Sequence, residues 1–322
     1  MDFSNKLILA PMAGITGSIF RRICRRMGAD ITWTEMVSAD GLVRGGAATR
    51  ELVFFTPEER PLGIQLFGAH PEVIGSACEI IAEFKPDFID LNFGCPVPKV
   101  VKRNGGASLL RNPELVASLV REAVKNARGI PVTAKIRSGW EPGQINYLEV
   151  ARRLFDAGIS ALTLHPRTRD QRFAGRSDWS RIEQLKRISP VPIIGSGDVF
   201  EPQDALEMFR STGCDAVMIG RGAMGNPWIF RRARALIAGR GDPGDPSLQE
   251  RFDQVLEHTV MMVEKHGAAR GIIIMRRHFG CYTRGLPESS HLRRELFSCL
   301  SLNQVQRIFS QYLERYQCTL SG

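Results

Sequence analysis

The sequence lacks any long uninterrupted apolar segment, although 43% of its 322 residues are hydrophobic. No run approaches the ~20 apolar residues that a membrane-spanning helix needs. The opening, MDFSNKLILAP, has neither the charged start nor the length of a signal peptide. These absences argue against a membrane protein and predict a cytoplasmic, globular chain with a large core.

Paired cysteines are missing as well. The seven cysteines are odd in number and scattered, and none belongs to a C-x-x-C pair. This argues against a disulfide framework and against a zinc or iron–sulfur site, so we expect no bound metal. Most cysteines are expected to be small buried hydrophobic side chains. They are Cys24, Cys78, Cys95, Cys214, Cys281, Cys299 and Cys318.

Acidic residues are outnumbered, with 34 Asp and Glu against 43 Lys and Arg, and the net charge is +9. Such a balance is compatible with a polyanionic partner. Charge runs on helices are usually solvated faces, and we expect this of at least half of the clustered arginines. The clusters are Arg21, Arg22, Arg25 and Arg26; Arg231, Arg232 and Arg234; and Arg276, Arg277, Arg284, Arg293 and Arg294.

Short apolar runs alternate with segments of helical periodicity over roughly the first 220 residues, which is typical of a (β/α)₈ TIM barrel. The alternative is a doubly wound parallel sheet. Nearly every predicted strand ends in an unusual polar residue, which favours the barrel because a barrel brings all its strand carboxyl ends to one face. The predicted strands are 7–11, 31–36, 62–68, 88–94, 132–137, 161–166, 191–198 and 216–222.

The segment GDPGDPS, residues 241–247, is dense in Gly, Pro and Asp and is typical of a linker. Beyond it the apolar residues follow a helical rhythm, with helices expected near 252–263, 272–282 and 291–316. We therefore predict two domains: a TIM barrel over 1–240 and an all-helical domain over 241–322.

The stretch DLNFGCP, residues 90–96, ends an apolar strand with Asn92, Cys95 and Pro96. Pro96 removes a backbone donor and disfavours helical geometry at Cys95, so we expect Cys95 to be exposed at a rim. The cysteine is a core residue, a nucleophile or a general acid. With a reference pKa of ~8.5, a thiol is protonated at neutral pH and can donate a proton. A nucleophile would need an activating base or cation nearby.

Three further polar residues end predicted strands. Lys135 lies in an apolar run, and a lysine there is more often functional than structural. His165 is either a functional residue or a satisfied rim histidine. Gln65 offers a donor and an acceptor, which suits either a planar polar ligand or a cap on the barrel mouth.

Two glycine-rich turns follow predicted strands seven and eight: GSGD at 195–198 and IGRG at 219–222. Either alone indicates only a tight turn. Together they favour a phosphate site, because these loops often bind phosphate in TIM barrels and Arg221 adds a charge-assisted contact.

The chain closely resembles the tRNA-dihydrouridine synthases, in particular the B-like bacterial subgroup. The resemblance covers the whole barrel, with weaker motifs beyond it. The motifs, in the family's order and spacing, are APMAG at 10–14, QLFG at 65–68, DLNFGCP at 90–96, KIR at 135–137, HPRTR at 165–169, GSGD at 195–198 and IGRGAMGNPWIF at 219–230.

This resemblance implies an FMN-dependent enzyme that reduces the C5–C6 double bond of specific uridines in tRNA, with NADPH as reductant. Cys95 would protonate C5 and Asn92 would orient the base. The residues implied in cofactor binding are Pro11, Met12, Ala13, Gln65, Lys135, His165, Ser196, Gly197, Asp198, Gly220 and Arg221. The helical domain would grip the tRNA. The oligomeric state and the target uridine stay open.

The chain departs from the family pattern at two positions. Ser196 stands where the family usually has Asn, and Pro166 where it commonly has Gly.

Two other functions are compatible with parts of the sequence. One is an FMN barrel that acts on a free pyrimidine, but iron–sulfur cysteines are missing and a basic helical domain would have no purpose. The other is a non-catalytic RNA-binding protein, against which Cys95, Lys135 and Arg221 argue.

Overall fold

The computed structural model describes residues 2–320, with side chains described to residue 316. The expectation of a buried side chain at Cys318 therefore lies outside the described side chains. Met1 and residues 321–322, at the two ends of the predicted domains, also lie outside the described residues.

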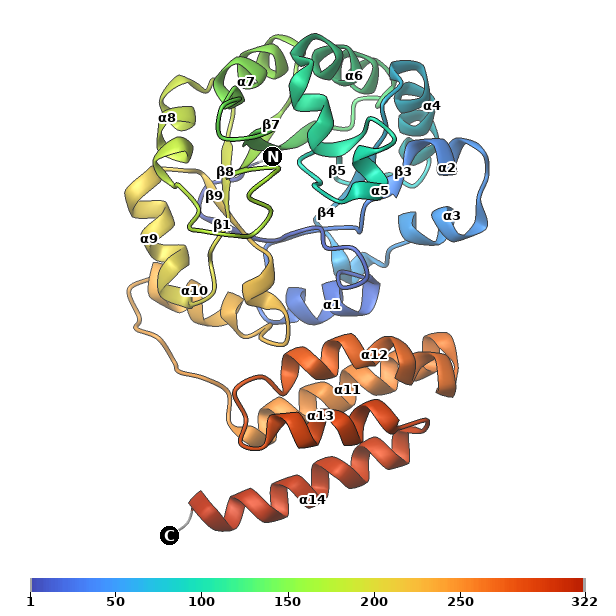
Figure 1. Ribbon diagram of the computed structural model, residues 1–322, viewed down its shortest axis with the longest axis vertical. Coiled ribbons are helices and arrows are strands. Elements are labelled where there is room, and N and C mark those ends of the chain that lie inside the picture. Colours follow the sequence, from blue (N-terminus) through green and yellow to red (C-terminus); the bar gives the residue numbers. More distant parts are fainter. Residues whose placement is uncertain (1, 321–322) are drawn as a thin grey trace.

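Eight parallel strands close into a barrel, so the predicted TIM barrel is confirmed and the open sheet is wrong (Figure 1). The first strand pairs with both the second strand and the last strand, which closes the barrel. The strands are β1 (Lys6–Leu9), β2 (Ile31–Trp33), β4 (Leu62–Phe67), β5 (Phe88–Phe93), β6 (Val132–Gly139), β7 (Ala161–Thr168), β8 (Ile193–Ser196) and β9 (Ala216–Ile219).

The strand boundaries differ from the prediction. The first strand is Lys6–Leu9 where 7–11 was expected, the seventh is Ile193–Ser196 where 191–198 was expected, and the eighth is Ala216–Ile219 where 216–222 was expected. Two others end one residue earlier than expected, at Phe67 and Phe93. The strand expected over 31–36 ends at Trp33, and the chain then forms a separate short strand, β3 (Val37–Ser38), which pairs with the end of β4. Strands β6 and β7 run two residues further than expected, to Gly139 and Thr168.

Helices surround the barrel (Figure 1). Proline stands in the first turn of α4, α6 and α9, where its missing N–H has no helical partner to lose. The helices are α1 (Ser18–Arg26), α2 (Ala39–Val43), α3 (Ala47–Val53), α4 (Pro71–Ala82), α5 (Pro98–Val101), α6 (Pro113–Asn126), α7 (Tyr147–Asp156), α8 (Ser180–Ile188), α9 (Pro202–Thr212) and α10 (Ile229–Ile237), with 3₁₀ turns η1 (Pro57–Glu59), η2 (Gly106–Arg111) and η3 (Arg221–Ala223).

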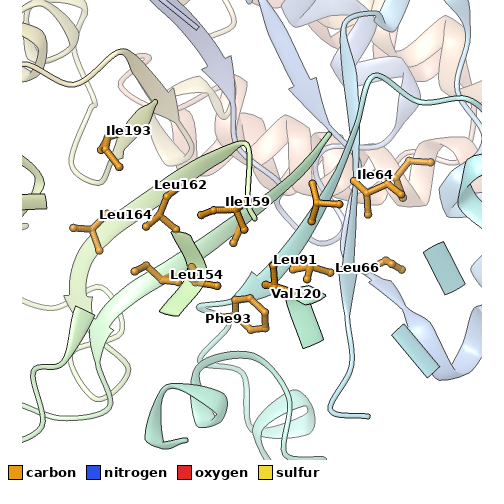
Figure 2. Packing of buried hydrophobic residues seen from close by; sticks show 14 of the residues in the cluster. Ile64, Leu66, Leu91, Phe93, Val120, Leu154, Ile159, Leu162, Leu164 and Ile193 are labelled. Carbon is orange, nitrogen blue, oxygen red and sulfur yellow. The ribbon is translucent and has the colours of Figure 1, made fainter. Parts of the chain in front are cut away.

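Alternate side chains of β5 point to opposite sides of the barrel wall, either outwards to the surrounding helices or into the barrel. Leu91 and Phe93 of β5 belong to one hydrophobic cluster with Val120 of α6 and Leu154 of α7 (Figure 2). Because successive side chains of a strand point to opposite faces, Asp90 and Asn92 face the inside of the barrel. The inside is therefore polar at this level of β5.

Four helices follow the barrel and pack below it (Figure 1): α11 (Leu248–His266), α12 (Ala268–Tyr282), α13 (Ser289–Ser298) and α14 (Leu302–Leu320). The helix expected over 291–316 is thus two helices. The bundle has its own hydrophobic cluster, which takes in Ile19 and Ile23 of α1 and so joins the bundle to the barrel. The domain division at residue 241 stays a prediction. Within residues 2–320, no helix is long and apolar enough to span a membrane.

Candidate active site

A cavity of about 430 Å³ lies at the carboxyl ends of the barrel strands. This is the face on which TIM-barrel enzymes carry their active sites. The structure gathers around it all but one of the residues singled out from the sequence: Pro11, Met12, Ala13, Asn92, Cys95, Lys135, His165, Ser196, Gly197, Asp198, Gly220 and Arg221.

Cys95 lines the cavity but is only 7% exposed, so the expectation of an exposed rim cysteine is wrong. Its loop folds back against the start of η2, where the N–H of Ala107 donates to the Cys95 carbonyl at 3.1 Å. A Cβ on Gly106 would come within 2.7 Å of that same oxygen, so the close approach depends on glycine. Burial raises the pKa of the Cys95 thiol, which keeps it protonated at neutral pH.

The Asn92 side chain fixes the loop that contains Cys95. Its Oδ1 accepts hydrogen bonds from the N–H of Cys95 at 2.9 Å and of Gly94 at 3.1 Å. Its Nδ2 donates to Gln65 Oε1 at 2.8 Å. Asn92 therefore has a clear role in shaping the Cys95 loop, besides lining the cavity.

Gln65 is the one predicted site residue that does not line the cavity. It is fully buried, and its Nε2 donates to Asp90 Oδ2 at 2.6 Å. Its predicted contact with a cofactor stays a prediction.

Lys135 and His165 lie on neighbouring strands, and burial disfavours the charged form of each. Burial, and then the charge of Arg137, lowers the pKa of Lys135 to about 8, against the opposing effect of Asp90. Burial also lowers the pKa of His165 well below its ordinary value, helped by Lys135 and the arginines around it. Its Nε2 lies 3.3 Å from Arg167 Nη1; because a guanidinium only donates, Nε2 accepts and the proton sits on Nδ1.

Arg137 is a site residue to which the sequence assigned no role. It is 3% exposed and donates to three backbone carbonyls: Gly94 at 2.8 Å, Thr168 at 2.8 Å and Arg172 at 2.9 Å. It thereby ties the Cys95 loop to the loop after β7. Its spacing of two from Lys135 on β6 was the available signal, since both then face the same side.

Asp198 pairs with two arginines. Arg167 binds it with both Nη atoms, at 2.8 and 2.6 Å, and Arg221 Nη2 lies at 3.1 Å. Although partial burial alone would raise the pKa of this carboxyl, the hydrogen bond from Arg167 and the N–H of Ser177 lower it. Asp198 therefore aligns Arg221 through this ion pair.

Two aromatic side chains at the cavity mouth were missed from the sequence. Phe173 is 52% exposed and Phe200 is 40% exposed, yet both line the cavity. The Arg221 guanidinium lies 4.6 Å from the first ring centroid and 4.9 Å from the second. These two cation–π contacts help to fix the position of Arg221.

Gly197 has a backbone that only glycine adopts easily, with φ of 114°. A Cβ there would meet His165 Cδ2 at 2.7 Å and would also collide with the Ser177 hydroxyl. The backbone is fixed by Trp179 Nε1, which donates to the Gly197 carbonyl at 2.9 Å. The chain can therefore approach a ligand closely at this turn.

The charge at the cavity suits an anion. Lys135, Arg137 and Arg221 line the cavity with one carboxylate, Asp198, while His165 is neutral. Charge-assisted hydrogen bonds from arginines are the usual means of binding phosphate. Among the described side chains, residues 2–316, no group of His, Cys, Asp and Glu is arranged to hold a metal ion.

Several clustered arginines are engaged within the protein. Arg21 binds Glu59 at 2.5 Å with both side chains buried. Arg26 binds Glu257 of α11 at 2.6 Å, and Arg232 binds Asp242 at 2.7 Å. Arg234 pairs with Asp30. The first two clusters therefore stabilise the fold as well as adding positive charge.

The family model described as "Dihydrouridine synthase (Dus)" matches residues 8–317. A probable tRNA-dihydrouridine synthase of Aquifex aeolicus is 41% identical over 319 residues, which cover 98% of this chain and 98% of that protein. The tRNA-dihydrouridine synthase B of Pasteurella multocida is 36% identical over 307 residues, 95% of this chain and 92% of that protein.

Among solved structures, a histamine dehydrogenase from Rhizobium sp. 4-9 matches with a TM-score of 0.53 at 13% identity, covering 73% of this chain and 46% of that one. A likeness at that identity concerns the barrel fold alone.

Proposed function

The chain belongs to the dihydrouridine synthase family, and from that premise we propose that it reduces the C5–C6 double bond of specific uridines in tRNA, with FMN bound in the barrel and NADPH as reductant. The observation that carries the proposal is the cavity itself. A buried, protonated thiol lies in the same cavity as a glycine turn and Arg221, which are suited to a phosphate.

The residues present fit a flavin that carries a phosphate. Gly197 and Gly220 leave room for backbone contact, and Arg221 is aligned by Asp198 and by two aromatic rings. Ser196, Gly197, Gly220 and Arg221 would hold the phosphate end, with Asp198 acting through Arg221. Pro11, Met12 and Ala13 would lie along the ring, and Gln65, Lys135 and His165 would be near its polar edge. When bound, FMN supplies the hydride that adds to C6 of uracil.

Cys95 is proposed as the general acid. Its Sγ–H donates a proton to C5 as C6 gains hydride, so both new C–H bonds are accounted for and the thiol becomes a thiolate. The positive charge of Arg137 opposes the effect of burial on the Cys95 pKa, and would therefore stabilise that thiolate until solvent returns a proton. Asn92 fixes the loop so that the thiol faces the cavity.

The substrate must bring one base out of a folded RNA to reach this cavity. We propose that the barrel, residues 1–240, carries the chemistry and that the helical part, residues 241–322, binds tRNA. The arginines of α12 and α13 that follow the linker would contact the RNA backbone, since phosphates are bound chiefly by Arg and Lys.

The proposal is tested with Cys95→Ala, and Cys214→Ala serves as the matched control because Cys214 is similarly buried but does not line the cavity. Wild-type protein should purify with FMN. Cys95→Ala should keep FMN and its reduction by NADPH, yet form dihydrouridine in unmodified tRNA about 10²- to 10⁴-fold more slowly, as expected when a general acid is lost. Cys214→Ala should keep the wild-type rate.

Dihydrouridine is measured by mass spectrometry of the digested tRNA. Full turnover by Cys95→Ala would refute the role as acid. A colourless protein that cannot be reconstituted with FMN would refute the function itself.

A further inference from the structure

Three buried polar residues share one level of the barrel interior below the cavity. Gln65 of β4 is in register with Asp90 of β5, and Asp90 is in register with Thr133 of β6. Asp90 is 1% exposed, and the other two are fully buried. Asn92 lies on the same face of β5, two residues closer to the mouth. These residues form a polar path from the interior to the Cys95 loop.

Hydrogen bonds connect the path without a gap. Asp90 Oδ1 accepts from Thr133 Oγ1 at 2.6 Å, and Asp90 Oδ2 accepts from Gln65 Nε2 at 2.6 Å. Gln65 Oε1 accepts from Asn92 Nδ2 at 2.8 Å. Asn92 Oδ1 then accepts from the backbone N–H of Cys95 at 2.9 Å.

The Asp90 carboxylate fixes which group donates and which accepts in each hydrogen bond along this path. An amide can turn over and exchange its donor and acceptor ends, but an ionised carboxylate only accepts. Gln65 must therefore point its NH₂ at Asp90 and its oxygen at Asn92. Asn92 in turn must point its NH₂ at Gln65, which leaves its oxygen for the Cys95 loop.

Asp90 can act in this way at neutral pH. Burial raises its pKa to about 6, while hydrogen bonds from Gln65 and Thr133 and the charge of Lys135 act in the opposite direction. The carboxyl is thus mainly ionised at pH 7, and burial in a place of low dielectric makes its hydrogen bonds costly to break.

We propose that Asp90 is a positioning residue: it sets the orientation of the Gln65 and Asn92 amides and thereby holds the Cys95 loop in the conformation that presents the thiol to the cavity. The consequence for catalysis rests on the proposed function. The consequence for the loop does not, because it concerns only the geometry of this chain.

Three variants separate this role from a general contribution to the core. Asp90→Val removes both acceptors. Asp90→Asn keeps an oxygen for Gln65, and its NH₂ can donate to the Thr133 hydroxyl, which is free to rotate, so the direction of the path is retained. Thr133→Val is the matched control, because it removes the other hydrogen bond to Asp90 at the same level but leaves the path to Cys95 intact.

The first measurement is the rate at which iodoacetamide alkylates Cys95, followed by mass spectrometry of the peptide that contains it. Asp90→Val should raise this rate about tenfold, the factor that corresponds to one lost hydrogen bond holding the loop. Asp90→Asn and Thr133→Val should match wild type. Equal rates in Asp90→Val and Thr133→Val, or a rate in Asp90→Asn as high as in Asp90→Val, would overturn the proposal.

Gln65→Met breaks the same path with Asp90 in place, and it decides the question if Asp90→Val does not fold. Its Cys95 should also be alkylated about tenfold faster. An unchanged rate in Gln65→Met would equally overturn the proposal.

The second measurement is turnover on unmodified tRNA. In enzyme saturated with FMN, Asp90→Val should lower kcat about 10²-fold, the effect of a misplaced catalytic group, with KM for tRNA unchanged, and Asp90→Asn should restore the rate. A wild-type kcat in FMN-saturated Asp90→Val, or a rise in KM for tRNA that accounts for the lost activity, would contradict a role in positioning Cys95. If wild-type protein forms no dihydrouridine, the proposed function fails, while the alkylation rates still decide the role of Asp90.

Discussion

Replacing Gly197 by Ala should weaken cofactor binding more than it weakens the fold. The backbone at this position has φ of 114°, and a left-handed conformation costs an L-residue about 1–2 kcal/mol. The new Cβ would in addition meet His165 Cδ2 at 2.7 Å and the hydroxyl of Ser177. Both side chains would have to move.

Displacement of Ser177 would also disturb Asp198 and, through it, Arg221. The N–H of Ser177 donates to Asp198 Oδ2 at 2.8 Å, and Asp198 aligns Arg221. Loss of one hydrogen bond to a charged group is worth about 1.5–3 kcal/mol. We therefore expect Gly197→Ala to raise the Kd for FMN about 10- to 100-fold.

Gly213→Ala is the control for backbone strain. Gly213 also has a positive φ, 64°, but a Cβ there would meet nothing within 4 Å. The free energy of unfolding of Gly213→Ala should be lower than that of wild type by about 1 kcal/mol, with the Kd for FMN unchanged. The free energy of unfolding is measured by urea denaturation, and the Kd by quenching of flavin fluorescence in a titration with apoprotein. An FMN Kd in Gly197→Ala equal to that of Gly213→Ala would refute the reasoning.

Three other outcomes are expected. Glu59→Gln leaves the Arg21 charge buried without its partner and should lower the free energy of unfolding by about 3–5 kcal/mol, whereas Glu257→Gln, at an exposed pair, should cost about 0.2–1 kcal/mol; equal losses in urea denaturation would contradict this. Burial lowers the pKa of His278 to about 4, so the unfolded chain takes up this proton first as the pH falls. Stability should therefore decline from pH ~6.5 towards pH ~4, by up to about 1.4 kcal/mol per pH unit for this group, and a His278→Gln variant with an unchanged slope would speak against it. Finally, tRNA affinity should fall steeply with salt in a filter-binding assay, because bound phosphates release counterions; a flat response would argue against an RNA-binding surface.

The barrel could be predicted because its evidence is local. Each strand is a short apolar run with a helix after it, and this repeat is visible without any long-range contact. The polar residues at strand ends then had to share one face, since parallel strands in a barrel point the same way. Boundaries were less predictable: the strand expected to Met36 stops at Trp33 because β3 forms its own pairing with β4.

Cys95 illustrates what local sequence leaves out. Pro96 and Gly94 correctly indicate a loop, but the cover over that loop comes from η2, with Gly106 against the Cys95 carbonyl. The expectation of an exposed thiol was wrong for that reason. Arg137 shows the same limit, since its three carbonyl partners come from the loop after β5, from the end of β7 and from the loop after β7.

The sequence by itself determined the barrel, the set of polar residues at its mouth and the family, because periodicity and motifs are properties of neighbouring residues. Only the tertiary structure decided that Cys95 is buried, that Asp198 pairs with Arg167 and Arg221, and that Gln65 bonds to Asp90 behind the cavity. Burial, pKa and hydrogen-bond partners depend on groups from separate strands. These groups come close to one another only when the barrel closes.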